Sequence, residues 1–356
     1  MFPDIIHASG REIGPGRPCF LAAEIGINHN GDLALARELI GAAARAGADG
    51  VKFQNYRTED FLSDRSLLLS YTSGGQRITE PQWDLFKRCE LRPEWLAELK
   101  RLCDESGIAF FSTPTSELGV RELVEIGAAL LKNGSDFLTH TPLLEYMGRT
   151  GIPVVVSTGM AETEDVDEAV AAVHGGGRSP LMLLHCTSSY PTPPSAVNLR
   201  RMVSLQERYR VPAGFSDHTE GNVAAVQAVT LGACFLEKHF TLNHGLPGPD
   251  HWFSSTPQEF AELVEAVRAA EQRLGSGDIQ PAATEAEGRR KYRLSLAAAM
   301  DLKAGTYFVP EMAVLRRPGT GLLPKNLWRL AGAVLARDMA RGEPLTAECF
   351  KGFALQ

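Results

Sequence analysis

The sequence predicts a closed (β/α)₈ barrel followed by a small β-rich domain. Between Pro18 and about residue 274, short apolar runs alternate with amphipathic stretches, eight of each, which is typical of parallel strands joined by helices. Asn28-His29-Asn30-Gly31 follows the first strand where an open doubly wound sheet would carry a glycine-rich dinucleotide loop, so that rival fold is disfavoured. A short internal repeat near the C-terminus indicates the second domain.

Each predicted strand is an apolar run that stops in polar residues. Strands are expected at 20–27, 51–55, 108–112, 129–133, 153–157, 181–186, 213–216 and 234–239. Apolar residues at helical spacing predict helices at 33–47, 82–106, 116–126, 142–150, 163–173, 197–208, 220–231 and 257–274. Residues 1–17 predict an irregular or hairpin lead-in, and the connection at 57–81 is long enough to be a lid or binding loop.

The chain divides into three parts. The barrel, with its N-terminal hairpin, is expected over 1–280, a linker over 281–295, and the small β-rich domain over 296–356. In the small domain, Ala299–Gly305 is echoed by Ala336–Gly342. A duplicated β-turn-β unit of this size is close to the lower limit for independent folding, so docking to a neighbour is expected.

The amino-acid composition limits the classes of binding partner and the cellular compartment that we expect. The 356 residues are 44% hydrophobic and 22% charged, with a formal net charge of -7, which is ordinary for a globular protein with a sizeable core. The acidic balance argues against nucleic acid or an anionic membrane as the main partner, and no apolar run is long enough to span a bilayer. Six scattered cysteines without CxxC pairing predict reduced core residues of a cytoplasmic protein.

Two histidines and two carboxylates lie at or beyond the ends of the last two strands. Alternate side chains of a strand share a face, so Glu237 and His239 point one way and Lys238 the other, while His218 ends the preceding strand and Asp250 follows. Imidazole and carboxylate together suit a divalent metal such as Mn²⁺. Taken singly, each histidine is better explained as a hydrogen-bonded barrel residue, and only the clustering indicates a metal.

Polar residues at the C-terminal strand ends build the active sites of such barrels. Lys52 and Lys132 lie within apolar strands, where an unpaired ammonium is costly to bury. With Thr113, Ser135, Ser157 and Ser216 they predict a site for a phosphate and a carboxylate. The alternative is that each lysine pairs with a structural carboxylate such as Glu24. A phosphorylated substrate beside a metal fits carbon–carbon bond formation, isomerisation or hydrolysis.

In this order, the residues resemble the sialic acid synthase family, bacterial enzymes that condense phosphoenolpyruvate with an N-acylated aldohexose. The resemblance covers nearly the whole chain and rests on Ala23–Gly31, Val51–Gln54, His185–Thr187 with Tyr190–Pro193, Ser216–Thr219, and Glu237–Thr241 followed by Pro247–Asp250. The C-terminal segment, with Arg317-Pro318-Gly319, is similar to the family's antifreeze-like (SAF) domain.

The resemblance implies a transferase that makes a nonulosonic acid from phosphoenolpyruvate, an N-acyl amino sugar and water. Its implied metal ligands are His218 and His239, with Mn²⁺ as the usual ion and Mg²⁺ or Co²⁺ as alternatives. Phosphoenolpyruvate would be held by Lys52, Thr113, Lys132, Ser135, Ser157 and Ser216, and the sugar by Gln54, Tyr190, Asp250 and Arg317. Glu24 would handle protons, and with Asp250 and the two histidines it completes the implied catalytic set. The resemblance also implies a domain-swapped homodimer, in which Arg317 reaches the partner's barrel.

One departure from the family concerns the sugar. Members commonly carry a glutamate shortly after the serine of the fourth strand, whereas here Ser135 is followed by Asp136 and Phe137. Phe137 cannot accept a hydrogen bond, so altered sugar contacts are expected. A legionaminate- or pseudaminate-type synthase, another metal-dependent barrel enzyme that uses phosphoenolpyruvate in an aldol-type reaction, and a non-catalytic sugar-binding protein are the alternatives. The last is disfavoured by the His, Lys and Glu24 side chains at strand ends.

Overall fold

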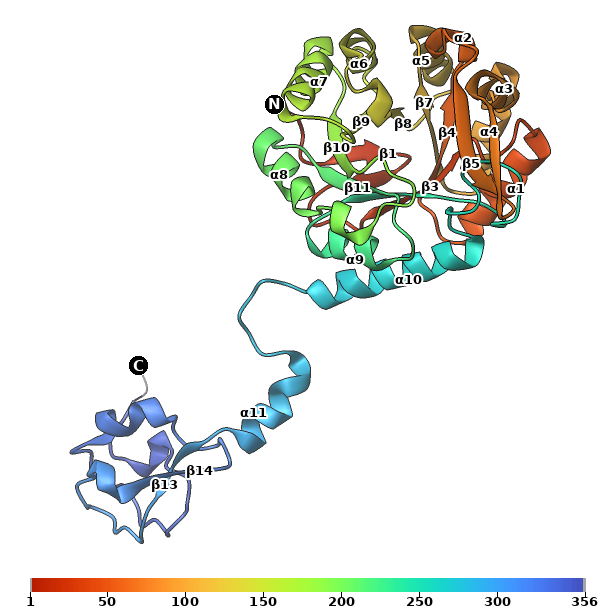
Figure 1. Ribbon diagram of the computed structural model, residues 1–356. Helices are drawn as coiled ribbons and strands as arrows, with labels where there is room; N and C mark the ends of the chain where they lie inside the picture. Colours follow the sequence, from red (N-terminus) through yellow and green to blue (C-terminus); the bar gives the residue numbers. More distant parts are fainter. Residues whose placement is uncertain (1, 355–356) are drawn as a thin grey trace. The chain divides into compact units, whose positions relative to one another are not determined.

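The computed structural model describes residues 2–354 and shows two compact units, one up to Gly275 and one from Ser276 (Figure 1). In the described chain, no helix has both the length and the apolar character that a membrane crossing requires. The first unit contains the barrel and the second a small β-rich fold.

Eight parallel strands close the barrel in the order β10-β11-β12-β3-β4-β7-β8-β9 (Figure 1), which confirms the predicted fold class. They are β3 (Phe20–Gly26), β4 (Gly50–Asn55), β7 (Ala109–Pro114), β8 (Leu130–Asn133), β9 (Val154–Ser157), β10 (Leu181–Cys186), β11 (Ala213–Asp217) and β12 (Phe235–His239). Closure pairs the last strand with the first. The register therefore places His239 beside Glu24, and Glu24 beside Lys52.

Besides the short helix α2 (Thr58–Phe61), nine helices of the described first unit lie in the connections between strands or follow the last one. They are α1 (Leu33–Arg45), α3 (Gln82–Arg88), α4 (Pro93–Glu105), α5 (Glu117–Glu125), α6 (Thr141–Gly148), α7 (Thr163–Gly176), α8 (Arg200–Tyr209), α9 (Val223–Thr230) and α10 (Pro257–Leu274). The single helix predicted at 82–106 is wrong, because the chain breaks there into α3 and α4. Arg92 is extended and Pro93 starts the second helix, as expected for a residue before proline.

The long connection after β4 is structured. It contains the short helix α2 (Thr58–Phe61) and an antiparallel hairpin of β5 (Leu68–Ser73) and β6 (Gln76–Pro81). Gly74 and Gly75 turn the hairpin with φ of 57° and 76°, which glycine adopts without strain. At the hairpin tip, the Ser73 hydroxyl accepts a hydrogen bond of 3.1 Å from the Gly248 amide, so this insertion is tied to the loop that follows β12.

The lead-in forms the predicted hairpin, with β1 (Ile6–Ala8) paired to β2 (Arg11–Ile13). Ile6, Ala8 and Ile13 are buried in one cluster with Phe20 and Phe235 of the barrel strands. The hairpin therefore packs against side chains of the barrel interior.

The second unit begins with a helical segment, η3 (Ala283–Glu285) and α11 (Ala286–Tyr292), inside the predicted linker. β13 (Ser295–Ala298) then pairs antiparallel with β14 (Ala313–Arg316). The two sequence repeats meet across a bridge between Leu302 and Met339. Each repeat's aspartate accepts a backbone amide of the other copy, Asp301 from Arg341 and Asp338 from Ala304, both at 2.8 Å. The repeat is thus a reciprocal pair of turns around one core.

Candidate active site

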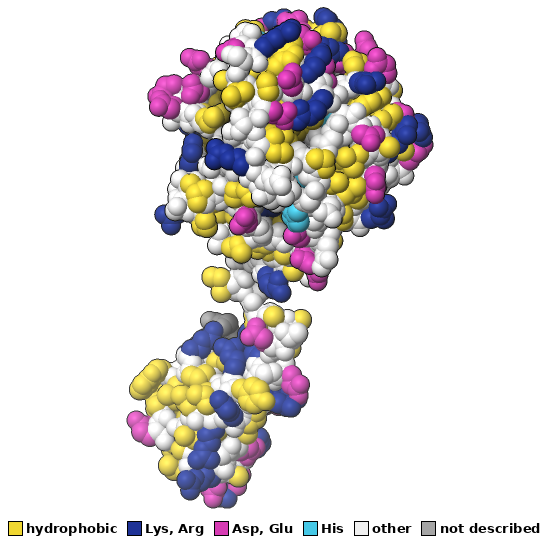
Figure 2. Space-filling view, turned by 45° about the vertical axis from the view of Figure 1, so that its right-hand side comes forward, with side chains coloured by type: hydrophobic (Ala, Val, Ile, Leu, Met, Phe, Trp, Pro, Cys, Tyr) yellow, Lys and Arg dark blue, Asp and Glu magenta, His cyan; other side chains and the backbone are white. Residues whose placement is uncertain are grey.

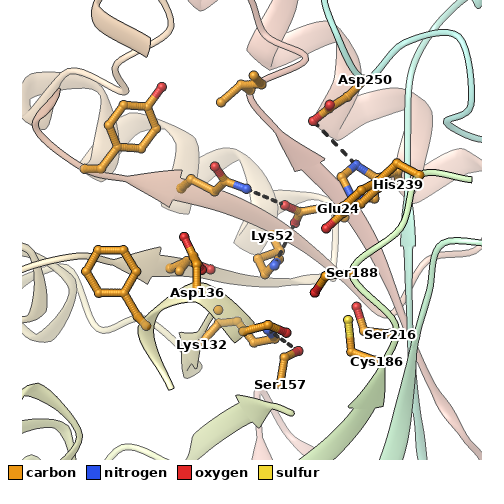
Figure 3. Close-up of a pocket in the computed structure, with 18 of the residues that line it drawn as sticks. Glu24, Lys52, Lys132, Asp136, Ser157, Cys186, Ser188, Ser216, His239 and Asp250 are labelled. Atoms are coloured by element: carbon orange, nitrogen blue, oxygen red, sulfur yellow. Dashed lines mark hydrogen bonds and ion pairs between the residues drawn. The ribbon is translucent and has the colours of Figure 1, made fainter. Parts of the chain in front are cut away.

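One cavity of about 490 Å³ lies at the C-terminal ends of the barrel strands (Figure 3). Twelve of the thirteen predicted site residues line it: Glu24, Lys52, Gln54, Thr113, Lys132, Ser135, Ser157, Tyr190, Ser216, His218, His239 and Asp250. The thirteenth, Arg317, is an exposed residue of the second unit, and its predicted contact with the sugar stays a prediction. The volume lies within the range usual for small-molecule sites.

A buried chain of alternating charges crosses the cavity floor. Lys52 Nζ lies 3.3 Å from Glu24 Oε2 and 3.1 Å from Glu237 Oε1, and Lys132 Nζ lies 3.9 Å from the same Glu237 oxygen. Gln54 donates to Glu24 at 3.2 Å. Lys52 therefore pairs with Glu24, as the alternative to an anion site predicted. It also lines the cavity, as the prediction of an anion site requires.

Burial and neighbouring charges give these groups different proton affinities. Burial raises the pKa of Glu24 to about 7, although Lys52 opposes the rise. Burial also acts to raise the pKa of Glu237, but the ammonium groups of Lys132 and Lys52 hold it at about 2. Burial lowers the pKa of Lys132 to about 8. Glu24 can therefore exchange a proton near neutral pH, as a general acid or base must, whereas Glu237 stays ionised.

Hydroxyl groups surround the lysines. Lys132 Nζ donates to Ser157 Oγ at 2.7 Å, and Ser216 Oγ donates to Glu237 at 3.0 Å. Ser135 Oγ accepts the Gly159 amide at 3.0 Å, and in the described chain Thr113 Oγ1 is buried without a hydrogen-bond partner. Ammonium and hydroxyl donors together can hold the oxygens of a phosphate or carboxylate.

The two predicted metal ligands are neighbours, with ring centroids 5.4 Å apart. His218 Nδ1 lies 2.9 Å from the Thr187 carbonyl, which can only accept. Nδ1 therefore carries the proton and Nε2 is left with a lone pair, the arrangement typical of a ligating histidine. Burial lowers the pKa of His239, so its imidazole is neutral.

The donor set fits a divalent cation held by few protein atoms. His239 Nδ1 is a buried atom without a hydrogen-bond partner among the described residues, and Asp250 Oδ2 lies 3.8 Å from it. Within residues 2–354, no three His, Cys, Asp or Glu side chains form a ready set of metal ligands. An ion at this place would thus take two imidazole nitrogens from the protein and complete its shell with water or substrate oxygens.

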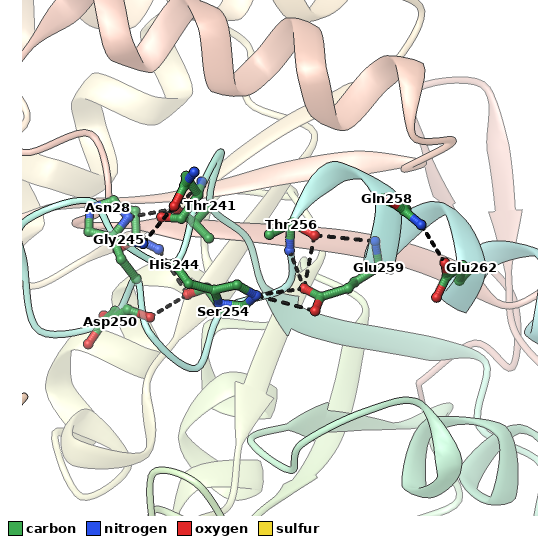
Figure 4. A network of polar contacts seen from close by, with 12 residues as sticks. Asn28, Thr241, His244, Gly245, Asp250, Ser254, Thr256, Gln258, Glu259 and Glu262 are labelled. Carbon is green, nitrogen blue, oxygen red and sulfur yellow. Dashed lines mark hydrogen bonds and ion pairs between the residues drawn. The ribbon is translucent and has the colours of Figure 1, made fainter. Parts of the chain in front are cut away.

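Asp250 is held by a polar network that joins its loop to the turn after β3 (Figure 4). Asn28 Nδ2 donates to the Phe240 carbonyl at 2.9 Å and to Ser254 Oγ at 3.0 Å. Ser254 Oγ in turn donates to the Asp250 carbonyl at 2.6 Å. With the contact at the hairpin tip, the loop is attached at two points, which restricts where the Asp250 carboxylate can lie.

Lys238 points away from the cavity, as the strand alternation predicts. Its ammonium donates to Asp217 at 2.8 Å and to the carbonyls of Thr219 and Gly221 at 2.6 Å and 2.9 Å. These three acceptors flank His218. The buried lysine therefore holds the turn that presents the histidine to the cavity.

The sequence interpretation missed several lining residues. Glu237 was expected beside the metal, but it bridges the two lysines. All six cysteines of the described chain are free and buried, as predicted, yet Cys186 also lines the cavity together with Ser188. Asp136 and Phe137, which depart from the family pattern, are lining residues as well. Cys186 and Ser188 could have been predicted as lining residues, because they lie at and just after the C-terminal end of a strand, where the other site residues were expected.

Comparison with known proteins agrees with this geometry. The profile of the NeuB family matches residues 39–279, and that of the SAF domain matches residues 293–351. The chain is 38% identical over 339 residues to N,N'-diacetyllegionaminic acid synthase of Legionella pneumophila, covering 94% of this chain and 95% of the relative. It is 34% identical over 328 residues to human N-acetylneuraminate-9-phosphate synthase, covering 91% and 90%.

A solved structure is similar as well. The N-acetylneuraminic acid (sialic acid) synthetase of Leptospira borgpetersenii, crystallised with citrate, superposes with a TM-score of 0.73 at 34% identity and covers 81% of this chain and 95% of that one. The predicted family resemblance and the prediction of an enzyme are thereby confirmed. The roles of individual residues stay predictions.

Proposed function

The chain belongs to the NeuB family, and from this premise we propose that it condenses phosphoenolpyruvate with an N-acylated hexose and water to give a nonulosonic (sialic) acid and phosphate. The hexose would be N-acetylmannosamine or a relative. The observation that supports this most is the buried chain Glu24–Lys52–Glu237–Lys132 beside two adjacent imidazoles in one cavity. An anion site and a metal site that share one cavity are what the reaction requires.

Phosphoenolpyruvate would bind at the lysine end. Lys52 and Lys132 neutralise its charge, while the hydroxyls of Thr113, Ser157 and Ser216 accept or donate hydrogen bonds around its oxygens. Both lysines are nearly fully buried, at 5% and 1% exposure. Their attraction for an anion is therefore screened little by water.

The aldehyde of the open-chain sugar would lie beside His218 and His239. A divalent cation held by these imidazoles, Mn²⁺ in our proposal with Mg²⁺ or Co²⁺ as alternatives, would polarise the carbonyl. The methylene carbon of phosphoenolpyruvate forms the new bond to the aldehyde carbon, whose oxygen becomes the hydroxyl of the product. Tyr190, Gln54 and Asp250 line the cavity and would orient the sugar, because a near-attack geometry supplies much of the rate.

Glu24 would handle the proton of the attacking water. Water adds to the carbon that bears the phosphate ester, the carboxylate of Glu24 accepts its proton, and phosphate leaves as the 2-keto group forms. A carboxyl pKa of about 7 lets the group accept this proton and release it again at neutral pH. Gln54, which donates to Glu24 at 3.2 Å, keeps the carboxylate in place.

We further propose a homodimer in which the second unit caps the partner's barrel, so that Arg317 approaches the N-acyl group. Residues 1–275 carry 24 Lys and Arg against 35 Asp and Glu, whereas residues 276–356 carry 12 against 8. Opposite net charges favour association of the two kinds of unit. The second unit also exposes Tyr307 and Trp328, at 71% and 75%, and Figure 2 shows apolar and basic side chains gathered on its visible face. Exposed apolar groups of this kind mark interaction surfaces.

The direct test is phosphate release from phosphoenolpyruvate with Mn²⁺ and a panel of N-acyl hexoses. We expect release only when both substrates are present, and loss of release in Lys132→Met. Lys100→Met, which removes an ammonium from the outer helix α4, should behave like the parent. Release with unacylated aldose phosphates alone would instead favour a different aldol-type enzyme, and the absence of release with every sugar would refute the proposal.

A further inference from the structure

The two proposed metal ligands are held in different ways. The His218 ring is fixed by a polar contact, since its Nδ1 lies 2.9 Å from the Thr187 carbonyl. The buried Nδ1 of His239 has no hydrogen-bond partner among the described residues, and Asp250 Oδ2, 3.8 Å away, is too distant to form such a bond. A histidine that binds a metal usually has its second ring nitrogen fixed by a hydrogen bond. His239 therefore needs a different support.

Aromatic rings lie against the His239 imidazole instead. The centroid of the Phe253 ring is 5.1 Å from that of the imidazole, with 65° between the planes, and the Tyr190 ring is 5.8 Å away at 87°. Tyr190 also contacts Phe253, at 5.4 Å. The His218 ring is a further neighbour, at 5.4 Å. Aromatic groups favour edge-to-face contacts of this kind, and the imidazole cannot turn far without displacing one of these rings.

The backbone leaves Phe253 little freedom to move away from His239. Its segment folds back onto the strand that carries the histidine, because the Ser255 amide donates to the His239 carbonyl at 2.7 Å. The Thr241 amide in turn donates to the Ser255 carbonyl at 3.0 Å. Phe253 lies two residues before this anchor and is half-buried. Its ring is thereby fixed relative to β12 itself.

Phe253 supports the histidine without occupying the substrate volume. The described residues that line the cavity include His239 and Tyr190 but not Phe253. A phenyl ring also carries no atom that could bind a cation or exchange a proton. Its contact with the imidazole is therefore the contribution that this side chain can make to the site.

We propose that Phe253 is a positioning residue for the metal site: its ring keeps the His239 imidazole in the orientation in which it can bind one divalent cation together with His218. This inference rests on the proposed function, which supplies the cation. An imidazole that is already oriented loses less conformational freedom when it binds a metal than one that can turn. Removing the ring should therefore weaken metal binding.

The experiment measures Mn²⁺ binding by calorimetry in the parent, Phe253→Leu and Phe253→Tyr. Leucine keeps an apolar side chain without the ring, and we expect the Kd of Mn²⁺ to rise about tenfold or more, since losing a residue that orients a metal ligand typically costs roughly 10- to 100-fold in affinity. Phe253→Tyr retains a ring and should bind Mn²⁺ like the parent. In assays of phosphate release, saturating Mn²⁺ should restore kcat of Phe253→Leu, because only the affinity has fallen.

Phe137→Leu is the matched control. Phe137 is likewise half-buried, and its ring also stacks on a histidine, His140, with centroids 6.2 Å apart. In the described chain it forms no ring pair with either proposed metal ligand, so this variant should keep the Mn²⁺ affinity of the parent. Thermal unfolding measures the stability of each variant, and Phe253→Met replaces Phe253→Leu if the latter does not fold.

The result that overturns the inference is a lower Tm of Phe253→Leu with an unchanged Kd of Mn²⁺, which is what a purely structural role of the ring would produce. Equally weak Mn²⁺ binding by Phe253→Tyr and Phe253→Leu would overturn it as well, since the ring would then not be the feature that matters. Both results leave the proposed condensation intact.

Crystal structures of the metal-free proteins separate this inference from the proposed function. The His239 ring should keep one orientation in the parent and in Phe253→Tyr, and adopt a second one in Phe253→Leu. If the parent binds no divalent cation, the proposed metal site fails, and these structures decide about Phe253. A changed orientation of the His239 ring would then uphold the positioning role, and the same orientation in all three proteins would overturn it.

Discussion

Replacing Glu237 by glutamine should weaken the fold and strengthen anion binding at the same time. The carboxylate lies 3.1 Å from Lys52 Nζ and 3.9 Å from Lys132 Nζ. With an effective dielectric constant of about 20, these contacts correspond to gross attractions of about 5 and about 4 kcal/mol. Most of that is offset by the cost of burying the charges, and removing one partner of a buried pair typically costs about 3–5 kcal/mol.

The same substitution leaves two ammonium groups without their shared counter-ion. An anionic ligand no longer has to compete with Glu237 for Lys52 and Lys132, and it is no longer repelled by a nearby carboxylate. If about one third of the net cost of about 3–5 kcal/mol is returned on binding, the Kd of phosphoenolpyruvate falls about tenfold, which corresponds to about 1.4 kcal/mol. Glutamine suits the test because it keeps the shape and still accepts a hydrogen bond from Ser216.

Thermal unfolding and isothermal calorimetry with phosphoenolpyruvate measure the two effects separately. Glu122→Gln is the control, since Glu122 pairs with Arg57 in a partly buried salt bridge and neither of these two residues lines the cavity. That variant should lose stability without a change in affinity. Unchanged or weaker binding of phosphoenolpyruvate by Glu237→Gln would show that the two lysines do not form the anion site.

Three further predictions concern the metal, the Asp250 loop and the cap. His239→Ala should abolish Mn²⁺ binding, measured by metal titration, together with turnover, and leave the fold intact; full activity of the parent in metal-stripped buffer would contradict it. Asn28→Ala leaves two buried partners without a donor and should cost about 1–3 kcal/mol of stability. It should also lower kcat more than it raises either KM, because Asp250 loses its support, and equal loss in all kinetic constants would count against a positioning role. Arg317→Ala should raise KM for the sugar more than for phosphoenolpyruvate, and mixing it with inactive His218→Ala should restore some activity if the cap belongs to the partner subunit; the absence of rescue in mixed dimers would refute the swap.

Local patterns account for most of what could be predicted. A strand alternates its faces through backbone geometry alone, so the opposite directions of His239 and Lys238 follow from their adjacency in sequence. The break between α3 and α4 was also readable, because Pro93 constrains Arg92 before it. It was missed because the apolar periodicity continues across the break.

Contacts between distant segments could not be derived in this way. Nothing within the stretch around Glu237 indicates that its carboxylate is shared by Lys52 and Lys132, since those lysines lie on strands that reach it only through barrel closure. The apolar cluster around Ile27, Tyr56 and Leu85 is a similar case. Ile27 and Phe86, which packs against the cluster, are 59 positions apart and meet because the insertion after β4 folds back over the turn after β3. Leu69 joins them only in the hairpin register that the structure shows.

By itself, the sequence determined the barrel class, the strand ends and the chemical types of side chain available there, because hydrophobic periodicity and backbone sterics act over a few residues. Only the tertiary structure decided which of these groups face one another, as in the row His239, Glu24 and Lys52 formed where the last strand pairs with the first. Register and closure depend on packing summed over the whole barrel, and no single segment of the chain contains that information.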